Sequence, residues 1–472
     1  MTTPVRLVWL RNDLRLTDNP ALTHACRDDA AVVLVVTLTP ESWHAHGESL
    51  ARMGLWNDQL RSLLPECERL NLPLRVLHLQ RFADCAPALA DLAQQLGAAE
   101  LCFNYEYPLN ERNRDAAVCR ALERVGVSSR AFHGELIIPP GQVLTGQGGM
   151  FKVYTPFGNA WRRRLIDFDS PVIPCPSARR RAVCASEPLP ADLDYGAIRY
   201  RRDIWPVGEA HVSERLNTFV QERVQDYARK RDFPQTDPAG EGTSRLSPYL
   251  SIGALSPRQC LAALRAENDD PDWLHSSWLN ELIWREFYRH LLVAYPGLSR
   301  LEPFRPEVEA RISWQQDDPA FQAWCRGETG FPIVDAAMKQ LLDTGWMHNR
   351  LRMIVASFLT KLLRVDWRLG ADFFMRHLID GDFASNLGGW QWSSSVGADA
   401  APYFRIFNPQ VQGEKFDPNG TFVAHWLPEL RDIEPGKARQ RPGAGSARGR
   451  PEPIIDYKQA RQTALDDYQS GG

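Results

Sequence analysis

The sequence predicts a doubly wound α/β domain with a five-stranded parallel sheet, followed by an all-helical domain. Short apolar runs alternate with helical patterns over residues 1–134, which is typical of a parallel sheet with crossover helices. Over residues 207–472 strand-like runs nearly disappear and the periodicity is helical. Residues 135–206 are rich in Pro, Gly and Arg and lack periodicity, so we expect a connector there.

The elements of the first domain are expected in strict alternation. Buried strands are expected at residues 5–10, 32–38, 74–79, 101–105 and 130–133. Helical patterns lie between them, at residues 21–26, 48–64, 84–96 and 110–125. No Gly-x-Gly-x-x-Gly follows the first strand, so the sequence lacks a dinucleotide-binding fingerprint.

Composition excludes several classes of protein. The chain has 472 residues, and no apolar run is long enough to span a membrane. The N-terminus does not resemble a signal peptide, so we expect a cytoplasmic protein. Nine scattered cysteines without a Cys-x-x-Cys favour reduced thiols and predict no metal site. A net charge of −3 argues against a strongly basic nucleic-acid coat but allows a local basic groove.

Residues 380–392 form the most informative segment of the helical domain. Two carboxylates, Asp380 and Asp382, an amide, Asn386, and two indoles, Trp390 and Trp392, lie within thirteen residues. Three glycines in the same segment allow the backbone to approach a ligand closely. Polar groups that can bond a flat heterocycle therefore lie beside rings that can stack on it, which indicates an aromatic cofactor site.

The helix expected at residues 278–288 has an unusual polar face. At about 100° per residue, Trp278, Glu281, Trp284, Arg285 and Tyr288 share one side, and aliphatic and phenyl side chains lie opposite. A solvated face with ion pairs is the plain alternative. Three large aromatic rings on that face favour a binding surface.

Two further patterns stay ambiguous from the residues alone. The hydroxyls and the guanidinium of residues 241–247 precede an apolar helical run, which fits a phosphate site or an ordinary N-cap equally well. Trp314, Trp367 and Trp390 are far apart in the sequence, and each is as compatible with a core role as with a functional one.

Taken together, these motifs resemble those of the photolyase/cryptochrome family, in particular the bacterial class I cyclobutane pyrimidine dimer (CPD) photolyases. The resemblance extends from residue 7 to about residue 432. Its most specific parts are residues 7–16, 242–247, 278–291, 345–353, 380–392 and 401–409.

The resemblance implies FAD bound in the helical domain, active in its reduced anionic form. Asn386 matches a position next to flavin N5, and Arg352 is expected to pair with Asp380. Trp390, Trp367 and Trp314 match a chain that carries electrons to the flavin. The matched flavin-binding positions are Tyr227, Thr243, Ser244, Arg245, Leu246, Ser247, Trp278, Arg352, Asp380, Gly381, Asp382 and Asn386.

The resemblance also implies light-driven DNA repair. The excited flavin gives an electron to the dimer, the cyclobutane ring opens and the electron returns, which makes the enzyme a lyase. Photolyases are known to flip their target out of the duplex. Glu281 and Asn386 are the expected catalytic residues. The expected DNA-binding and dimer-binding residues are Arg231, Glu281, Trp284, Tyr288, Asn349, Arg350, Met353, Trp392 and Gln412. UV-damaged DNA is the only partner implied, and we expect a monomer.

An antenna chromophore is expected in the first domain. His46, Asn110 and Glu111 match antenna positions, and Arg300 stands where the family usually has Lys. The resemblance favours 5,10-methenyltetrahydrofolate, with an 8-hydroxy-deazaflavin as the alternative.

Two related activities fit less well. A (6-4) photolyase uses two active-site histidines; His348 matches the first, but Met353 occupies the second position. A cryptochrome photoreceptor often has Asp or Cys in place of Asn386, and a long tail, neither of which this chain shows. Residues 434–453 are rich in Gly, Pro and Arg, and we expect a loose loop without an assigned role.

Overall fold

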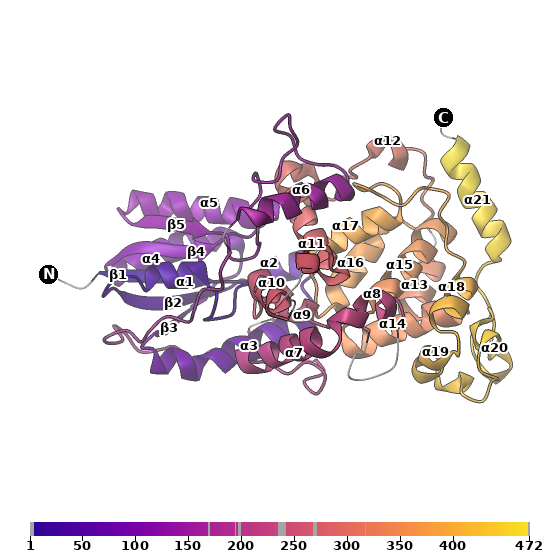
Figure 1. Cartoon of the computed structure of the whole chain (residues 1–472), viewed down its shortest axis with the longest axis horizontal. Coiled ribbons are helices and arrows are strands. Elements are labelled where there is room, and N and C mark those ends of the chain that lie inside the picture. The colour runs from indigo at the N-terminus through magenta and orange to yellow at the C-terminus, as the bar shows by residue number, and fades with distance from the viewer. Residues whose placement is uncertain are drawn as a thin grey trace. The chain divides into compact units, whose positions relative to one another are not determined.

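The computed structural model describes residues 4–168, 170–193, 195–196, 200–234, 242–267, 271–316 and 318–470. The chain forms two compact units (Figure 1). The first comprises Met1–Phe151, Thr155–Gln221 and Leu246–Ser299. The second comprises Lys152–Tyr154, Glu222–Arg245 and Arg300–Gly472.

The first unit contains a parallel sheet of five strands, as predicted. Its order is β3-β2-β1-β4-β5, so the winding reverses between β1 and β4 (Figure 1). The central strands β1 and β2 are buried along most of their length, which explains their largely apolar sequences. The strands are β1 (Val5–Leu10), β2 (Ala31–Leu38), β3 (Leu74–His78), β4 (Ala98–Asn104) and β5 (Ser128–Phe132).

Helices follow the strands in the predicted alternation. Two of them pack together and cover one apolar layer of the sheet, which includes Leu7, Val33 and Leu101. The helices of this part are α1 (Pro20–Ala25), α2 (Pro40–Ala45), α3 (Leu50–Arg69), α4 (Cys85–Gln95) and α5 (Leu109–Arg124), of which α4 and α5 form the packed pair.

The connector follows the outer edge of the sheet. The Glu187 N–H donates to the Leu74 carbonyl at 2.8 Å, and the Leu74 N–H donates to Ser186 Oγ at 3.1 Å. The Val76 N–H donates to the Glu187 carboxylate at 2.8 Å. These bonds satisfy backbone groups of β3 that would otherwise be open to another strand.

The rest of the first unit is helical and is fixed by a buried carboxylate. Glu286 accepts hydrogen bonds from the Ile137 and Ile138 N–H groups and, at 2.6 Å, from Trp161 Nε1. Burial raises the pKa of Glu286 to about 7, although the three hydrogen bonds act to lower it. The helices are α6 (Tyr154–Ile166), α7 (Glu209–Glu222), α9 (Ser247–Ser251), α10 (Pro257–Ala266) and α11 (Ser277–Ala294).

The regular elements of the second unit are all helices among the described residues, as the periodicity predicted. A π-helical turn, η5 (Phe358–Leu362), interrupts the regular pattern. No helix among the described residues is long and apolar enough to cross a membrane. The α-helices are α8 (Tyr227–Lys230), α12 (Pro306–Glu309), α13 (Asp318–Arg326), α14 (Pro332–Thr344), α15 (Asn349–Ser357), α16 (Trp367–His377), α17 (Phe383–Ser393), α18 (Pro409–Phe416), α19 (Thr421–Trp426), α20 (Lys437–Gln440) and α21 (Tyr457–Ser470).

The expectation of a loose loop at residues 434–453 was wrong. The Arg450 side chain is buried and pairs with Asp335 of α14 at 2.6 Å and with Glu429 at 3.0 Å. Asp335 also accepts bonds from the Thr329 and Gly330 N–H groups. A buried ion pair holds the segment in place, and the Gly and Pro content of the sequence did not indicate it.

Candidate functional site

A buried ion pair stands at the start of the 380–392 segment. Arg352 Nη2 donates to both carboxylate oxygens of Asp380, at 2.7 and 3.0 Å, and Arg352 Nε donates to the Met347 carbonyl at 2.8 Å. The Asp380 side chain is almost fully enclosed. The predicted pairing is therefore present, and it fixes a guanidinium edge and a carboxylate with few remaining degrees of freedom.

The two polar residues that follow are oriented by α17 and α16. Asp382 is the N-cap of α17 and accepts from the Ser385 N–H at 2.8 Å, and the Gly381 N–H donates to the Leu378 carbonyl. Asn386 Nδ2 donates to the Ala371 carbonyl of α16 at 2.9 Å. Because the amide nitrogen is committed to α16, the Asn386 oxygen is turned away from that bond and suits an N–H donor on a heterocycle.

Trp390 is buried against α16. Its ring lies 5.1 Å from the Phe374 ring and 6.0 Å from the Trp324 ring, centroid to centroid. A Cβ at Gly370 would overlap the Trp390 ring, so only glycine allows this close approach. Gly370 lies one helical turn after Trp367 in α16, and two predicted electron-transfer residues thus meet at one helix.

Trp367 is buried between opposite charges. Its Nε1–H donates to Glu309 at 2.9 Å, and the Arg368 guanidinium lies 4.6 Å from its ring centroid. Arg368 also pairs with Glu309 at 2.9 Å. An indole that donates to a carboxylate is easier to oxidise, and the adjacent guanidinium opposes this effect.

Trp314 is half-buried and belongs to the same neighbourhood. The Gln315 N–H donates to the Arg364 carbonyl at 2.7 Å, which joins the Trp314 segment to the turn before Trp367. Among the described residues, Trp314 Nε1 is buried without a hydrogen-bond partner. The three tryptophans that the sequence left separate are thus connected through consecutive packed segments.

The 242–245 segment folds onto α8 in the second unit. A Cβ at Gly242 would lie 2.8 Å from the Lys230 carbonyl oxygen, and Arg245 has a left-handed backbone with φ 51°. The Arg245 guanidinium lies 5.1 Å from the Trp346 ring centroid. Half-buried Thr243 and Ser244 and buried Tyr227 complete this predicted group, whereas Glu241 lies outside the described residues.

The predicted face of α11 is present in the first unit. Glu281, Trp284, Arg285 and Tyr288 are half-buried, whereas residues on the opposite side are buried. The Trp284 and Tyr288 rings lie 5.6 Å apart, centroid to centroid. Trp278 is buried beside Phe219, and in this same unit Leu246 is the N-cap of α9 and Ser247 is its first residue.

Basic and polar residues predicted to bind DNA lie in the second unit. Arg350 pairs with Asp232 at 2.8 Å, and its guanidinium lies 4.4 Å from the Phe416 ring centroid. Arg231 lies over Tyr227 at 5.2 Å. The other predicted contacts are exposed Asn349 and half-buried Met353, Trp392 and Gln412.

His348 is a buried cap and not an exposed acid. Its Nδ1 accepts the Arg350 N–H at 3.1 Å at the start of α15. Burial lowers the pKa of His348 to about 3, so the imidazole is neutral at pH 7.

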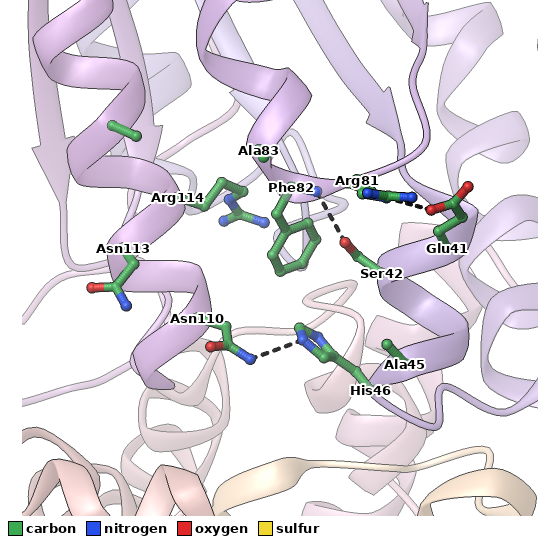
Figure 2. Close-up of a pocket in the computed structure, with 11 residues that line it drawn as sticks. Glu41, Ser42, Ala45, His46, Arg81, Phe82, Ala83, Asn110, Asn113 and Arg114 are labelled. Carbon is green, nitrogen blue, oxygen red and sulfur yellow. Dashed lines mark hydrogen bonds and ion pairs between the residues drawn. The ribbon is translucent and has the colours of Figure 1, made fainter.

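A pocket of about 500 Å³ lies in the first unit, at the carboxyl ends of the strands (Figure 2). Two predicted antenna residues, His46 and Asn110, line it, and Asn110 Nδ2 contacts His46 Nε2 at 2.9 Å. A third, Glu111, lies beside His46, with its carboxylate 3.5 Å from His46 Nδ1. The Phe82 ring stands edge-on to His46 at 5.1 Å and under the Arg114 guanidinium at 4.6 Å. Arg300 belongs to the second unit and pairs with Glu302 at 2.9 Å.

Burial and neighbouring charges shift the pKa values of three groups around this pocket. Burial and the neighbouring Glu106 raise the pKa of Glu111 to about 7. Burial tends to raise the pKa of Glu106 too, but Arg114 and Arg11 hold it below the usual range. Burial also lowers the pKa of His46, so this imidazole is neutral at pH 7.

Some residues of these sites gave no sequence signal. Phe82 lies alone after β3, and Glu309 ends the short helix α12; neither belongs to a motif. The expected order of strands could have suggested Phe82 as a site residue, because it follows β3 and the loops after parallel strands meet at one edge of the sheet. No local pattern could have joined Glu309 to Trp367.

Comparisons with known proteins agree over the whole chain. Residues 6–177 match the family described as DNA photolyase, and residues 278–470 match the FAD binding domain of DNA photolyase. The deoxyribodipyrimidine photo-lyase of Salmonella typhimurium is 47% identical over 477 residues, with 99% of each chain covered. A bacterial class III photolyase structure from Agrobacterium tumefaciens has a TM-score of 0.82 at 35% identity, covering 100% of this chain and 98% of its own. A Synechocystis sp. PCC6803 cryptochrome has a TM-score of 0.83 at 27% identity, covering 99% of both chains.

Proposed function

Because the chain belongs to the DNA photolyase family, we propose that it repairs cyclobutane pyrimidine dimers in UV-damaged DNA with the energy of light. The observation that carries the proposal is the group formed by α15, α16 and α17, where the Arg352–Asp380 ion pair, the oriented Asn386 amide and Trp390 occur together. The ion pair and the amide suit a flat heterocycle, and the Trp390 ring suits electron transfer.

The residues present fit FAD. Bound FAD in its reduced anionic form supplies the electron that splits the dimer after excitation by light. The Asn386 oxygen is turned to accept the N5–H that only a reduced flavin carries, and the Arg352–Asp380 edge can bond the polar edge of the ring. The hydroxyls of Thr243, Ser244 and Ser247 are assigned to the phosphates.

Aromatic and soft side chains are assigned to the dimer in each unit separately. In the first unit, Trp284 would stack on a pyrimidine. In the second unit, Trp392 would offer a second stacking ring and Met353 a soft contact. Glu281 would hydrogen-bond a pyrimidine edge and stabilise the added negative charge, in its acid form or with a shared proton. Arg231 and Arg350 would bind phosphates of the strand, beside Asn349 and Gln412.

Trp390, Trp367 and Trp314 are assigned to reduction of the cofactor. Each neighbouring pair is joined by packed or hydrogen-bonded segments, and Trp314 is the half-buried end of the series. Electrons would therefore enter at Trp314 and leave at Trp390. The repair step itself has no net electron demand, so this path serves activation and not turnover.

The pocket of the first unit is assigned to an antenna. Phe82 in the pocket lining offers an apolar ring surface. The Glu111 carboxylate, beside His46, is assigned to the donors of a pterin ring. We therefore place 5,10-methenyltetrahydrofolate here, with an 8-hydroxy-deazaflavin as the alternative. A cytoplasmic location and a monomeric state complete the proposal.

Illumination of reduced, FAD-loaded protein tests the repair function. An oligonucleotide with one CPD should lose its dimer in the light and keep it in the dark, whereas a (6-4) photoproduct should persist. Trp284→Ala should weaken dimer binding by about tenfold, because base stacking on an aromatic ring contributes ~1–3 kcal/mol. If loaded wild-type protein leaves the CPD intact in the light, the proposal is wrong.

A further inference from the structure

A histidine, a carboxylate and a thiol meet on one face of the sheet in the first unit. Glu100 and Cys102 are two residues apart in β4, so their side chains point to the same face. Leu101 and Phe103, which alternate with them, belong to the apolar layer that α4 and α5 cover. Glu100 and Cys102 therefore face the other side, where α1 packs against β4 and brings His24 to them.

The three donor atoms surround one point. Glu100 Oε2 lies 3.0 Å from His24 Nε2 and 3.7 Å from Cys102 Sγ, and all three ligand atoms lie within 4.8 Å of one another. A tetrahedral zinc ion, with bonds of about 2.0–2.3 Å, places its ligand atoms roughly 3.3–3.7 Å apart. The observed spacing needs only small movements of the side chains to accept such an ion.

The donor set favours zinc over the hard cations. An imidazole and a thiolate are ligands that Zn²⁺ prefers, whereas Mg²⁺ and Ca²⁺ require oxygen. The His24 and Glu100 side chains are 13% and 12% exposed, and Cys102 is fully buried. Burial and the neighbouring Glu100 raise the pKa of Cys102 to about 12, so the thiol keeps its proton when no metal is bound. Zinc binding would replace the S–H bond by a Zn–S bond and release that proton to solvent.

The charges around the group leave Glu100 Oε2 for a cation. Arg130 is 58% exposed and pairs with the other oxygen, Oε1, at 3.2 Å, and such a bond orients a ligating carboxylate. Arg6 approaches Oε2 at 3.6 Å but is committed elsewhere. Its Nη1 donates to two backbone carbonyls near the end of α1, at 2.9 and 3.2 Å, and its Nη2 lies 3.5 Å from Asp28. Because Asp28 balances Arg6, the remaining carboxylate and thiolate would neutralise a divalent ion.

We propose that His24, Glu100 and Cys102 bind one zinc ion, which links α1 to β4. The inference goes beyond the proposed function, because no step assigned to light, flavin or DNA uses these residues. The sequence predicted no metal site, since the chain has no Cys-x-x-Cys and His24 lies 76 residues before Glu100. The Phe132 ring, 5.1 Å from the His24 ring, limits movement of the imidazole. Three protein ligands leave the fourth tetrahedral position to water.

Zinc titration of the FAD-loaded protein tests the inference, after a chelator has removed metals and with the thiols kept reduced. Calorimetry should show one zinc ion bound per chain, and zinc should raise the midpoint of thermal unfolding. Magnesium should do neither, because it requires oxygen ligands. His24→Gln and Cys102→Ser should each lower zinc affinity by at least about tenfold and remove most of the rise in the midpoint. Cys175→Ser, which removes an exposed thiol outside the group, is the matched control and should bind zinc as wild type does.

Equal zinc binding by wild type, His24→Gln and Cys102→Ser would show an adventitious ion only and overturn the inference. Absence of saturable binding by wild type would overturn it too, and so would loss of binding in Cys175→Ser alone. If Cys102→Ser does not fold, His24→Gln decides, because the His24 side chain is partly exposed and lies outside the sheet. Dimer repair in the light is a separate readout. Protein that binds zinc and repairs no dimer contradicts the proposed function, whereas repair without zinc binding contradicts this inference alone.

Discussion

At the scale of single residues, the environment of Trp367 is set by Glu309 and Arg368. The carboxylate accepts the indole N–H and favours a positive charge on the ring, and the guanidinium opposes it. In the electron path that we propose, the balance between them sets how readily Trp367 passes an electron to Trp390.

Glu309→Gln should therefore slow photoreduction of oxidised FAD by roughly tenfold, because a hydrogen bond to a charged group contributes ~1.5–3 kcal/mol. Trp314→Phe should slow it as well. Dimer repair by chemically prereduced protein should stay normal in both variants. Glu307→Gln, on the same short helix but exposed and paired with Arg305, is the control. If Glu309→Gln is photoreduced at the wild-type rate, Trp367 does not belong to the proposed electron-transfer path.

Glu111 should make antenna binding depend on pH. Its pKa is raised to about 7, so the acid form predominates below that value. A pterin needs the carboxylate as acceptor, and binding below pH 7 must first remove the proton. Affinity for methenyltetrahydrofolate should fall by up to about tenfold per pH unit below 7. Titration of the bound folate absorption band measures this. Glu111→Gln should bind weakly and without the pH dependence; a wild-type profile in this variant would exclude the role.

At the scale of elements, the Arg450–Asp335 pair joins the late 434–453 segment to α14. Arg450→Ala leaves a buried carboxylate without its cation and should lower the free energy of unfolding by about 3 kcal/mol. Denaturant unfolding measures the loss. Arg448→Ala, whose exposed side chain reaches Asp432 at 3.4 Å, should change stability by less than about 0.5 kcal/mol. If the two variants have the same free energy of unfolding, the Arg450–Asp335 pair does not stabilise the protein.

The elements also show what a sequence can and cannot predict. The sheet could be predicted because β1 and β2 are buried along most of their length and are apolar except for Arg6 and Thr37. The Asp380–Arg352 pair was expected from family motifs. His24, Glu309 and Arg450 were not foreseen, because each acts across more than 40 residues of chain on a partner that no local period identifies.

At the scale of the whole molecule, DNA binding must work against a net charge of −3. A few arginines then carry the attraction, and affinity should fall steeply with salt. Arg350→Ala should weaken binding to damaged and undamaged duplexes alike and reduce the slope of log affinity against log salt by about one. Affinity measured from low to moderate salt provides the slope. An unchanged slope would mean that Arg350, which pairs with Asp232, does not reach a phosphate.

The hydrogen bonds of Ser186 and Glu187 along β3 have a practical consequence for dividing the chain. A fragment that stopped at residue 134 would keep all five strands and lose the segment that covers the outermost one. Its β3 would offer open N–H and C=O groups to any other copy, and such fragments would associate edge to edge. The Pro-rich stretch between the two predicted domains thus links them and also covers an edge strand that would otherwise promote association.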